Sequence, residues 1–256
     1  MGATTVAAMA PHLPPRLLAC LAGAALAVTV TVTGQPADAA VPTATSACAT
    51  TLRVATFNVN FALPPWKVNH DLDTLSPHAD VVLDQEAKNV TVDRLFGTGW
   101  HTHQNLQRRD QRGTSVAWRV GTTRGAAGYA LGVRPSGTAM LTRWISWTDL
   151  HVGGRTLRFA STHRPPPRYS GLWPRFDAAV GDFVHRSPYP VVLGLDSNSR
   201  DHGNLERRTG LSWSGPSIDG FLTDLPLGDV HALPRGWSDH HAVVGDLTVR
   251  QPGCPA

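Results

Sequence analysis

The sequence lacks three features that would each point to a particular class of protein. No unit repeats along its 256 residues, which argues against a solenoid or a propeller. The longest apolar run, residues 17–32, is rich in Ala, Thr and Gly and is shorter than the roughly 20 residues that span a bilayer. No long stretch has the composition of a disordered segment, and the 41% apolar content can fill one substantial core. One globular domain is the simplest expectation.

The first forty residues differ in kind from the rest. Arg16 precedes the apolar run and Ala37-Asp38-Ala39 follows it as a small-x-small cleavage site, a pattern typical of a secretory signal peptide. A membrane anchor is the alternative, but the short apolar run favours cleavage. We therefore expect a secreted mature protein without a stable membrane span. The expected parts are a signal peptide over residues 1–40, a linker over 41–51 and a domain over 52–256.

Only three cysteines are present, and Cys20 lies within the predicted signal peptide. Cys48, before the first expected strand, and Cys254, near the C-terminus, would remain after export. An oxidising compartment predicts a disulfide between them, which would join the two ends of the domain. Such a bridge could contribute on the order of 5 kcal/mol in the chain-entropy model. Two separate free thiols are the alternative.

The positive charge of the chain is carried almost entirely by arginine. There are 23 basic and 19 acidic residues, which gives a formal net charge of +4. The planar guanidinium fork matches phosphate bidentately, so an Arg-rich exported protein is compatible with a polyanionic substrate. A general compositional bias explains the same numbers, so this indication is weak by itself.

Hydrophobic periodicity predicts a series of strands interrupted by a helix over residues 171–186. A Gly153-Gly154 pair predicts the turn of a hairpin. Residues 121–137 and 199–216 are rich in Gly, Ser and Arg and are expected to be loops. The expected strands are residues 52–58, 80–84, 114–119, 145–152, 155–162, 191–195, 218–223 and 242–249.

Polar clusters lie at the ends of most of these strands. Because strand ends fix side chains while the adjoining loops leave them open to solvent, residues far apart in sequence can meet at one site. Asn, Glu, His and Asp side chains gathered in this way suit metal-assisted attack on a phosphate ester. The clusters are Thr56-Phe57-Asn58-Val59-Asn60, Asp84-Gln85-Glu86, Ser161-Thr162-His163, Gly194-Leu195-Asp196-Ser197-Asn198 and Ser238-Asp239-His240.

Each of these residues also has a structural explanation. Asn58 could cap a turn, and Glu86 could be a surface charge. Asp196 and Asn198 could form an Asx turn, and His240 could be a buried, hydrogen-bonded histidine. All of these explanations would have to hold together, which favours a shared site.

The ordered set of clusters resembles the endonuclease/exonuclease/phosphatase superfamily, the proteins similar to deoxyribonuclease I, over residues 52–249. The most specific motifs are Gly194-Leu195-Asp196-Ser197-Asn198 and Ser238-Asp239-His240-His241-Ala242-Val243. The resemblance implies an α/β (α+β) fold, a four-layer sandwich in which two mostly antiparallel β-sheets pack face to face with helices outside. It also implies a hydrolase that acts on phosphate ester bonds.

The resemblance implies a metal site and an attacking water. Glu86, with Asn58 and Asp239, would lie at a divalent cation, Mg²⁺ or else Mn²⁺ or Ca²⁺, because such hard cations prefer oxygen ligands. Asp196 would orient or deprotonate the attacking water.

The same resemblance implies contacts to the phosphate. His163 would contact the phosphate and help to protonate the leaving group, while Asn198 and Asn58 would hold phosphate oxygens. Asp239 would pair with His240 and raise its pKa, so that His240 stabilises charge on phosphorus or acts as an acid or base. Asp219 occupies the place of the family's Ile-Asp strand motif and would contact substrate, although the following Gly220 departs from that motif.

The substrate is left open by the resemblance. A nuclease that acts on DNA or RNA as a monomer is the leading hypothesis, because of export, positive charge and Arg-rich loops. A sphingomyelinase or phospholipase C-like enzyme is the alternative, although no long apolar hairpin for entering a membrane is evident. An inositol-phosphate phosphatase is third, and a catalytically silent binding module is the alternative outside enzymes. Only about twenty residues separate Asn198 from Ile218, so a substrate arm of larger family members is expected to be missing.

Several other residues have structural explanations that we prefer. His101 and His103 could chelate a metal, yet a solvent-facing strand explains their alternation. Trp66, Trp213 and Trp237 are expected in loops near the site, where they could stack on a base or a choline headgroup, although packing is the simpler explanation. A basic cluster that could face a nucleic acid, or simply be solvated, consists of Arg108, Arg109 and Arg112.

Overall fold

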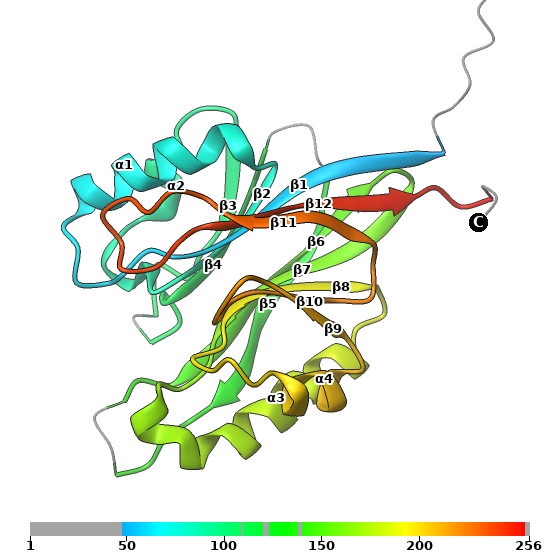
Figure 1. Ribbon diagram of the computed structural model, residues 1–256. Helices are drawn as coiled ribbons and strands as arrows, with labels where there is room; N and C mark the ends of the chain where they lie inside the picture. The colour runs from blue at the N-terminus through cyan, green and yellow to red at the C-terminus, as the bar shows by residue number, and fades with distance from the viewer. Residues whose placement is uncertain (1–47, 109, 120–122, 138–139, 254–256) are drawn as a thin grey trace, which may run out of the picture. The chain divides into compact units, whose positions relative to one another are not determined.

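Two six-stranded β-sheets packed face to face form the frame of the domain (Figure 1). The computed structural model describes residues 48–253 except 109, 120–122 and 138–139. The expected signal peptide and most of the expected linker lie outside these residues, so both remain predictions. Within the described part, no helix is long and apolar enough to cross a membrane.

The first sheet has the strand order β11-β12-β1-β2-β4-β3. All neighbouring strands are antiparallel except β1 and β2, which run parallel in the middle of the sheet. Its strands are β1 (Ala49–Asn58), β2 (Val81–Gln85), β3 (Trp100–His103), β4 (Thr114–Arg119), β11 (Leu227–Ala232) and β12 (Val243–Arg250).

The second sheet repeats this plan with the order β5-β6-β7-β8-β10-β9. Its one parallel pair, β7 and β8, again lies in the middle, and the other neighbours are antiparallel. Its strands are β5 (Thr123–Val133), β6 (Arg143–Val152), β7 (Arg155–His163), β8 (Val191–Asp196), β9 (Ser212–Ser214) and β10 (Asp219–Thr223).

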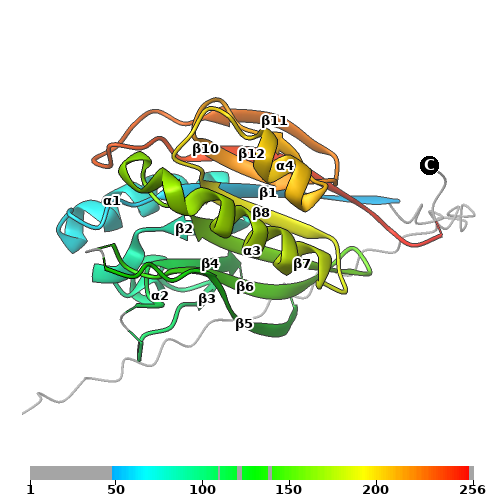
Figure 2. The same cartoon turned by 90° about the horizontal axis from the view of Figure 1, so that it is seen from below.

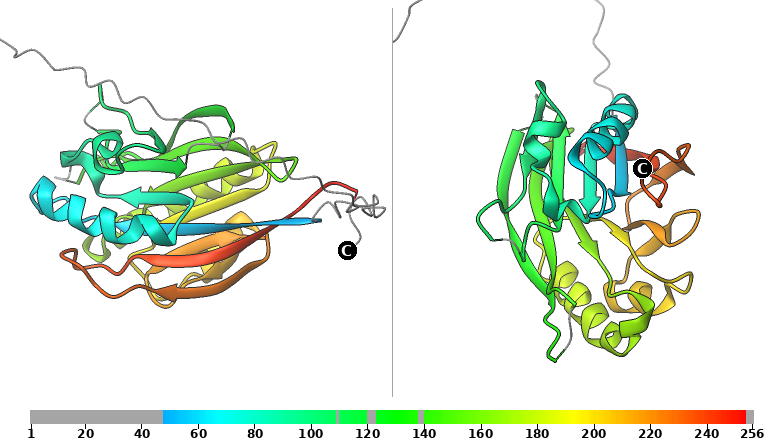
Figure 3. Two further views of the ribbon diagram at one scale, coloured as in Figure 1. Left: turned by 90° about the horizontal axis from the view of Figure 1, so that it is seen from above. Right: turned by 90° about the vertical axis from the view of Figure 1, so that its left-hand side faces the viewer.

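Three apolar layers hold the sheets and helices together. The middle layer joins Leu83 and Trp118 of the first sheet to Leu157 and Phe159 of the second. The outer layers lie beneath helices on each sheet, as Figure 2 shows for α3 and α4, and Figure 3 shows α1 on the opposite side of the strands. The expected four-layer sandwich is confirmed. The helices are α1 (Pro65–Leu75), α2 (Val92–Leu95), α3 (Trp173–His185) and α4 (Gly203–Thr209), with 3₁₀ segments η1 (Ser76–His78), η2 (Ala87–Asn89) and η3 (Pro167–Leu172).

Each sheet contains one strand–helix–strand unit that places two strand ends side by side. Helix α1 connects β1 to β2, and α3 connects β7 to β8. Helix α1 begins at Pro65, whose fixed φ suits a first helical turn, and it buries Val68, Leu72 and Leu75 at helical spacing. Because both strands of each pair run parallel, their carboxyl ends meet at one edge of the sheet.

Two segments that we expected to be loops contain regular structure. Residues 121–137 hold β5, and residues 199–216 hold α4 and β9. Strand β5 lies at the edge of its sheet beside β6, and its glycines hid it from a search for β-branched runs. At Gly128 a Cβ would lie 2.9 Å from the ring of Trp147, so glycine there permits close packing and not a loop. Helix α1 and strand β11 were also not expected, whereas the helix and the strands listed from periodicity are confirmed.

Candidate active site

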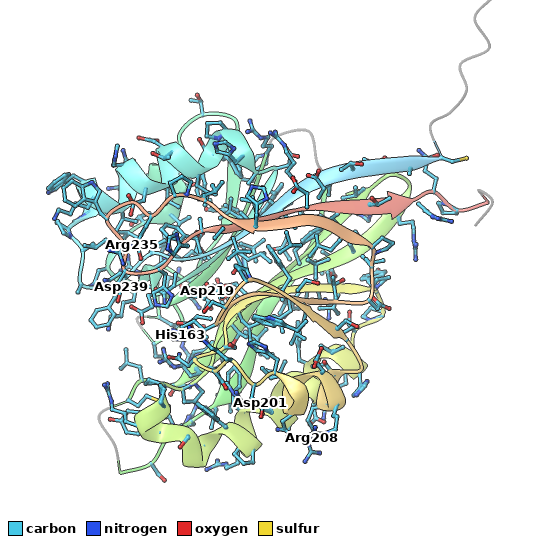
Figure 4. The ribbon with its side chains drawn as sticks, in the orientation of Figure 1. His163, Asp201, Arg208, Asp219, Arg235 and Asp239 are labelled. Carbon is cyan, nitrogen blue, oxygen red and sulfur yellow. The ribbon has the colours of Figure 1, made fainter. Side chains whose placement is uncertain are left out.

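The carboxyl ends of the two parallel strand pairs bring the polar clusters together. Asn58 ends β1, Glu86 directly follows β2, His163 ends β7 and Asp196 ends β8. Asp219, the first residue of β10, lies opposite Asp196 in the antiparallel β8–β10 ladder. Figure 4 shows His163 and Asp219 at the same end of the sheets. Asp239, from the loop before β12, lies at that end too.

Asp196 is a buried carboxylate in the middle of the site. Its Oδ2 atom accepts a hydrogen bond from Asn58 Nδ2 (3.0 Å) and lies 3.2 Å from His163 Nε2, while Oδ1 accepts from the Asn198 backbone N–H (2.8 Å). Burial alone would raise the pKa of Asp196. The hydrogen bond and charge of His163, the charge of His240 and the Asn198 N–H outweigh burial and lower this pKa to about 2. Asp196 is therefore ionised at neutral pH, and its low basicity favours orienting a water over deprotonating it.

His240 pairs with Asp219, and our expectation that it pairs with Asp239 is wrong. The Nδ1 atom of His240 lies 2.8 Å from Asp219 Oδ2, whereas Asp239 Oδ1 accepts a hydrogen bond from Asn60 Nδ2 (2.8 Å). The reason is the β8–β10 register, which sets Asp219 beside Asp196 so that both carboxylates approach the His240 ring. The Nε2 atom of His240 lies 3.7 Å from Asp196 Oδ2.

The pairing changes the acidity of both partners. Burial alone would lower the pKa of His240, but the hydrogen bond and charge of Asp219, with the charges of Asp196 and Asp239, raise it to about 9. Burial raises the pKa of Asp219, and the hydrogen bond to His240 opposes that rise. His240 is therefore protonated at neutral pH, where it can donate a proton or stabilise negative charge on a phosphate.

Glu86 leaves β2 in a backbone conformation that non-glycine residues seldom adopt. Its φ of 60° and ψ of 16° lie in the left-handed region. Its Oε2 atom accepts a hydrogen bond from the Phe61 N–H (3.1 Å), and its Oε1 atom lies 3.6 Å from His163 Nδ1. Asn60 and Asn198 also have positive φ values, 56° and 51°. Strained conformations of this kind cluster at functional sites, which agrees with a functional role for this group of loops.

The oxygen-rich side of the site fits a hard divalent cation. Glu86, Asn58 and Asp239 offer carboxylate and amide oxygens, the ligand type that Mg²⁺, Mn²⁺ and Ca²⁺ prefer. The Oε1 atom of Glu86 is too far from the nearest imidazole nitrogen for a hydrogen bond, so it can bind a cation.

A second group of ligand-type atoms suits protons and phosphate better than a metal. Asp196, Asp219 and His240 each place one such atom within 4.8 Å of the others. However, a protonated imidazole has no lone pair for a metal, and metal ligands must be deprotonated. The site therefore has a side suited to a cation and a side that holds and donates protons.

Comparisons with known proteins agree with this geometry at the level of fold. No protein-family model and no curated protein matches the sequence. Solved structures do match. One is D. rerio TDP2 complexed with single-strand DNA product, at 14% identity and a TM-score of 0.62, with 77% of this chain and 98% of that chain covered. The second is an endonuclease/exonuclease/phosphatase family protein from Bacteroides thetaiotaomicron (15% identity, TM-score 0.57, 78% and 95% covered). This chain has the endonuclease/exonuclease/phosphatase fold.

Another matching structure shows that this fold also occurs with a different named activity. A mannosyl-6-phosphatase from Bacteroides thetaiotaomicron is 16% identical, with a TM-score of 0.57 and coverage of 77% of this chain and 99% of that chain. At identities this low, the structural similarity establishes only the shared endonuclease/exonuclease/phosphatase fold. The substrate has to be inferred from this chain's own residues.

Arg143 belongs to the site but was not predicted. It begins β6, and its Nη1 atom lies 3.3 Å from His163 Nδ1 in a pocket of about 440 Å³ that Glu86, Asp196 and His240 also line. Burial lowers the pKa of Arg143, while the charges of Glu86 and Asp196 oppose that change. Its Nε atom is buried and has no hydrogen-bond partner among the described residues. A half-buried guanidinium in the pocket fits an anionic oxygen, but one arginine among many gives no such signal in the sequence.

Asp71 was also not predicted, and it fixes the loop that precedes β12. Its carboxylate accepts hydrogen bonds from the backbone N–H groups of Trp237 (2.9 and 3.0 Å) and Ser238 (2.9 Å). The Ser238 hydroxyl in turn donates to the Asn58 carbonyl (2.7 Å). A Cβ at Gly236 would collide with the Asp71 carboxylate, so glycine is required at this close approach. The loop is therefore tied both to α1 and to the end of β1.

His101 and His103, the two histidines that could have chelated a metal, both contact aromatic rings. His101 packs beside Trp118 with ring centroids 5.6 Å apart, and His103 stacks on Tyr129 at 4.6 Å. The Nε2 atom of His103 also lies 3.2 Å from the Gly128 carbonyl oxygen. His101 is exposed, as a solvent-facing strand predicts, whereas His103 is half-buried against β5 and does not simply face solvent.

The tryptophans and the basic cluster differ in part from expectation. Trp66 lies on α1 and Trp213 on β9, where it stacks on His202 at 3.8 Å, so neither is in a loop. Trp237 is in the loop before β12, as expected. In the basic cluster, Arg112 donates to the Val90 carbonyl (3.3 Å), and position 109 lies outside the described residues.

Proposed function

We propose that this protein is a divalent-metal-dependent hydrolase that cleaves phosphodiesters by in-line attack of water. The observation that carries the proposal is the convergence on Asp196 Oδ2, which lies 3.0 Å from Asn58 Nδ2, 3.2 Å from His163 Nε2 and 3.7 Å from His240 Nε2. One pocket thus combines a carboxylate that is ionised at neutral pH with amide and imidazole groups. Such a preorganised set can orient a water and stabilise a phosphate in its transition state.

The residues of the chain divide the chemistry among them. Asp196 would hold the attacking water in line with the phosphorus atom. His240, protonated and fixed by Asp219, would stabilise the charge that builds on the phosphate. His163 and Asn198, whose side chains lie 2.8 Å apart at Nε2 and Nδ2, would contact non-bridging oxygens, and Arg143 would add its unused N–H.

Glu86, Asp239 and Asn58 would hold the cation. When bound, a divalent cation polarises the phosphoryl group and stabilises charge on the leaving oxygen. The left-handed backbone at Glu86 and the Asn60–Asp239 hydrogen bond would keep these two carboxylates apart from the buried network.

Nucleic acid is the substrate class that we infer. Support comes from the excess of arginine, from the half-buried guanidinium of Arg143 in the pocket and from a structure of the same fold that was solved with a single-strand DNA product. The protein would act as a monomer. A sphingomyelinase or phospholipase C-like activity, an inositol-phosphate phosphatase and a silent binding module are the competing outcomes.

A substrate panel tests this proposal. Purified protein lacking residues 1–40 would be incubated with plasmid DNA, RNA, sphingomyelin and a phosphomonoester, each with Mg²⁺ and with EDTA. We expect cleavage of a nucleic acid with Mg²⁺ and none with EDTA. Cleavage of sphingomyelin or the monoester alone would replace the substrate class, and inertness toward all four would support a binding module.

Export and a terminal disulfide form a separate part of the proposal. The Cys48 carbonyl accepts a hydrogen bond from the Gln251 N–H (3.0 Å), which brings Cys48 to a residue three positions before Cys254 in sequence. Cys254 itself lies outside the described residues. Thiol titration of the unfolded, unreduced mature protein should detect no free thiol, and two free thiols would contradict the bridge.

A further inference from the structure

An exposed pair of tryptophans lies beside the site on the side of α1. Trp66, in the first turn of α1, and Trp237, in the loop before β12, meet edge to face with ring centroids 5.6 Å apart. They are 61% and 48% exposed, and Trp66 is the most exposed large apolar side chain among the described residues. Two adjacent tryptophans left in water contribute little to the core, so their exposure is more consistent with binding.

The tryptophan pair carries a positive charge. The chain has only two lysines, Lys67 and Lys88. Lys67 Nζ lies 4.0 Å from the ring centroid of Trp237 and 5.4 Å from that of Trp66. Within the described ranges, no carboxylate forms an ion pair with Lys67. We call Trp66, Lys67 and Trp237 the aromatic platform.

Lys88 makes the same kind of cation–π contact at the pocket. Its Nζ atom lies 3.6 Å from the ring centroid of Phe61, and both residues line the pocket that holds Arg143 and His163. Both lysines of the chain therefore lie over aromatic rings, and Lys88 also lines the pocket.

The platform is held in place relative to the catalytic groups. Trp237 precedes Asp239 by two residues, so their Cα atoms are at most about 7 Å apart. Its backbone N–H is fixed by the Asp71 carboxylate, which lies on the same helix as Trp66. A surface that is fixed before binding loses little conformational entropy when a ligand arrives.

We propose that the aromatic platform stacks on bases of a single-stranded nucleic acid while an adjacent phosphate of that strand lies in the active site. The inference rests on the proposed function for the position of the phosphate. Bases of any sequence present a flat π-face to aromatic side chains, and a nearby cation attracts the backbone. The faces of paired bases are covered by their neighbours in a duplex, so the platform should favour single strands.

The position of Lys67 distinguishes this ligand from a choline lipid. A quaternary ammonium headgroup binds over the face of an aromatic ring. Here the Lys67 ammonium already lies over both rings and would repel a second cation. The same charge attracts a phosphate.

Binding measured without turnover tests the platform. Fluorescence anisotropy with a labelled ten-residue oligo-dT in EDTA would compare the wild type with Trp66→Ala and Trp237→Ala. Each substitution should raise the dissociation constant about tenfold, while binding to a blunt duplex changes less than twofold. Lys67→Gln should reduce the slope of log Kd against log salt by about one. Thermal melts should stay within a few degrees, because both tryptophan side chains are largely exposed.

Tyr189→Ala is the matched control. Tyr189 is an exposed aromatic residue just before β8, at the opposite end of that strand from Asp196, and its removal should leave oligonucleotide binding unchanged. Wild-type binding by both tryptophan variants, equal wild-type affinity for duplex and single strand, or tryptophan-dependent binding to sphingomyelin vesicles would overturn the inference. Hydrolysis of bis(p-nitrophenyl) phosphate with Mg²⁺ is measured in parallel. Loss of that reaction in the wild type would contradict the proposed function, whereas the binding results would still decide on the platform.

Discussion

The two sheets share one strand plan but present different chemistry at the same edge. Each has a parallel pair in the middle, joined by a helix and flanked by antiparallel strands. The first pair ends at Asn58, which is buried and donates to Asp196, and at Glu86, whose carboxylate is partly open to solvent. The second pair ends at His163 and Asp196, which are both buried and hydrogen-bonded before any ligand arrives.

This difference shows that the two sheets determine where the site residues lie, whereas the residue types at the strand ends determine what each one can do chemically. Open oxygen atoms can exchange water for a cation, whereas a buried network is already oriented toward a phosphate. Several interactions connect the sides, and two of them involve the candidate catalytic groups directly. Asn58 donates to Asp196, and His240, in the loop before β12 of the first sheet, pairs with Asp219 of the second. Substitutions on each side should still have distinguishable effects, because one side would bind the cation and the other the phosphate.

The largest effect should follow from Asp196→Asn, on the buried side. The substitution keeps the volume and removes the charge that two imidazoles face. We expect kcat for a small phosphodiester to fall by about 10²–10⁴-fold with KM nearly unchanged, and the melting temperature to fall because the buried network loses its charge. Steady-state kinetics and a thermal melt measure both quantities. A kcat within threefold of the wild type would remove Asp196 from the mechanism.

On the open side, Glu86→Gln should act through the cation. Loss of one carboxylate ligand should raise the Mg²⁺ concentration for half-maximal activity by about tenfold or more. At saturating Mg²⁺, activity should recover in part, which distinguishes Glu86 from Asp196. Titration of activity with Mg²⁺ after EDTA treatment measures this, and an unchanged Mg²⁺ dependence would place the cation elsewhere.

Asp219→Asn should change the pH dependence of activity. Protonated His240 persists up to its raised pKa of about 9, so activity should fall as pH rises through that value. Removing the Asp219 anion disfavours the protonated imidazole and should move the alkaline limb of kcat/KM down by about 1–3 units. The pH profile from 5 to 10 measures the shift. If the limb stayed at its wild-type position, another group would be titrating.

The smallest effect should come from Asp71→Ala, which leaves the site residues intact and frees their loop. Loss of the hydrogen bonds to Trp237 and Ser238 should cost about 2 kcal/mol and lower the melting temperature by about 4–8 °C. We expect kcat to fall several-fold, with partial rescue in Asp71→Asn. Asp73→Ala, on the same helix but bonded only to Asn69, is the control. A loss of activity equal to that of Asp196→Asn would mean that Asp71 does more than position the loop.

Local patterns in the sequence predicted most of the frame. Buried strands such as 191–195 carry continuous apolar runs, and the polar residues that follow them mark the strand ends. The edge strand β5 was not predicted because it is rich in glycine, and one of these glycines, Gly128, permits close packing against Trp147. Helix α1 also has too few apolar residues to stand out, since it buries only one face.

The sequence predicted which residues the candidate site contains, but it did not predict which of them contact one another. Asn58, Glu86, His163, Asp196 and His240 follow from polar clusters, whereas the partner of His240 depends on how β10 aligns with β8. A neighbour in sequence, Asp239, was the natural choice and the wrong one. Arg143 and Asp71 act through burial and through backbone N–H groups, and neither property is visible in a single sequence.

One measurement tests the central claim most directly: hydrolysis of bis(p-nitrophenyl) phosphate by EDTA-treated wild type and His240→Ala, before and after Mg²⁺ is added. We predict no turnover in EDTA, recovery in the wild type with Mg²⁺, and at least about 100-fold less recovery in His240→Ala, measured below the temperature at which a melt shows that variant to unfold. Turnover that persists in EDTA, or that Mg²⁺ restores equally in both proteins, would contradict the account.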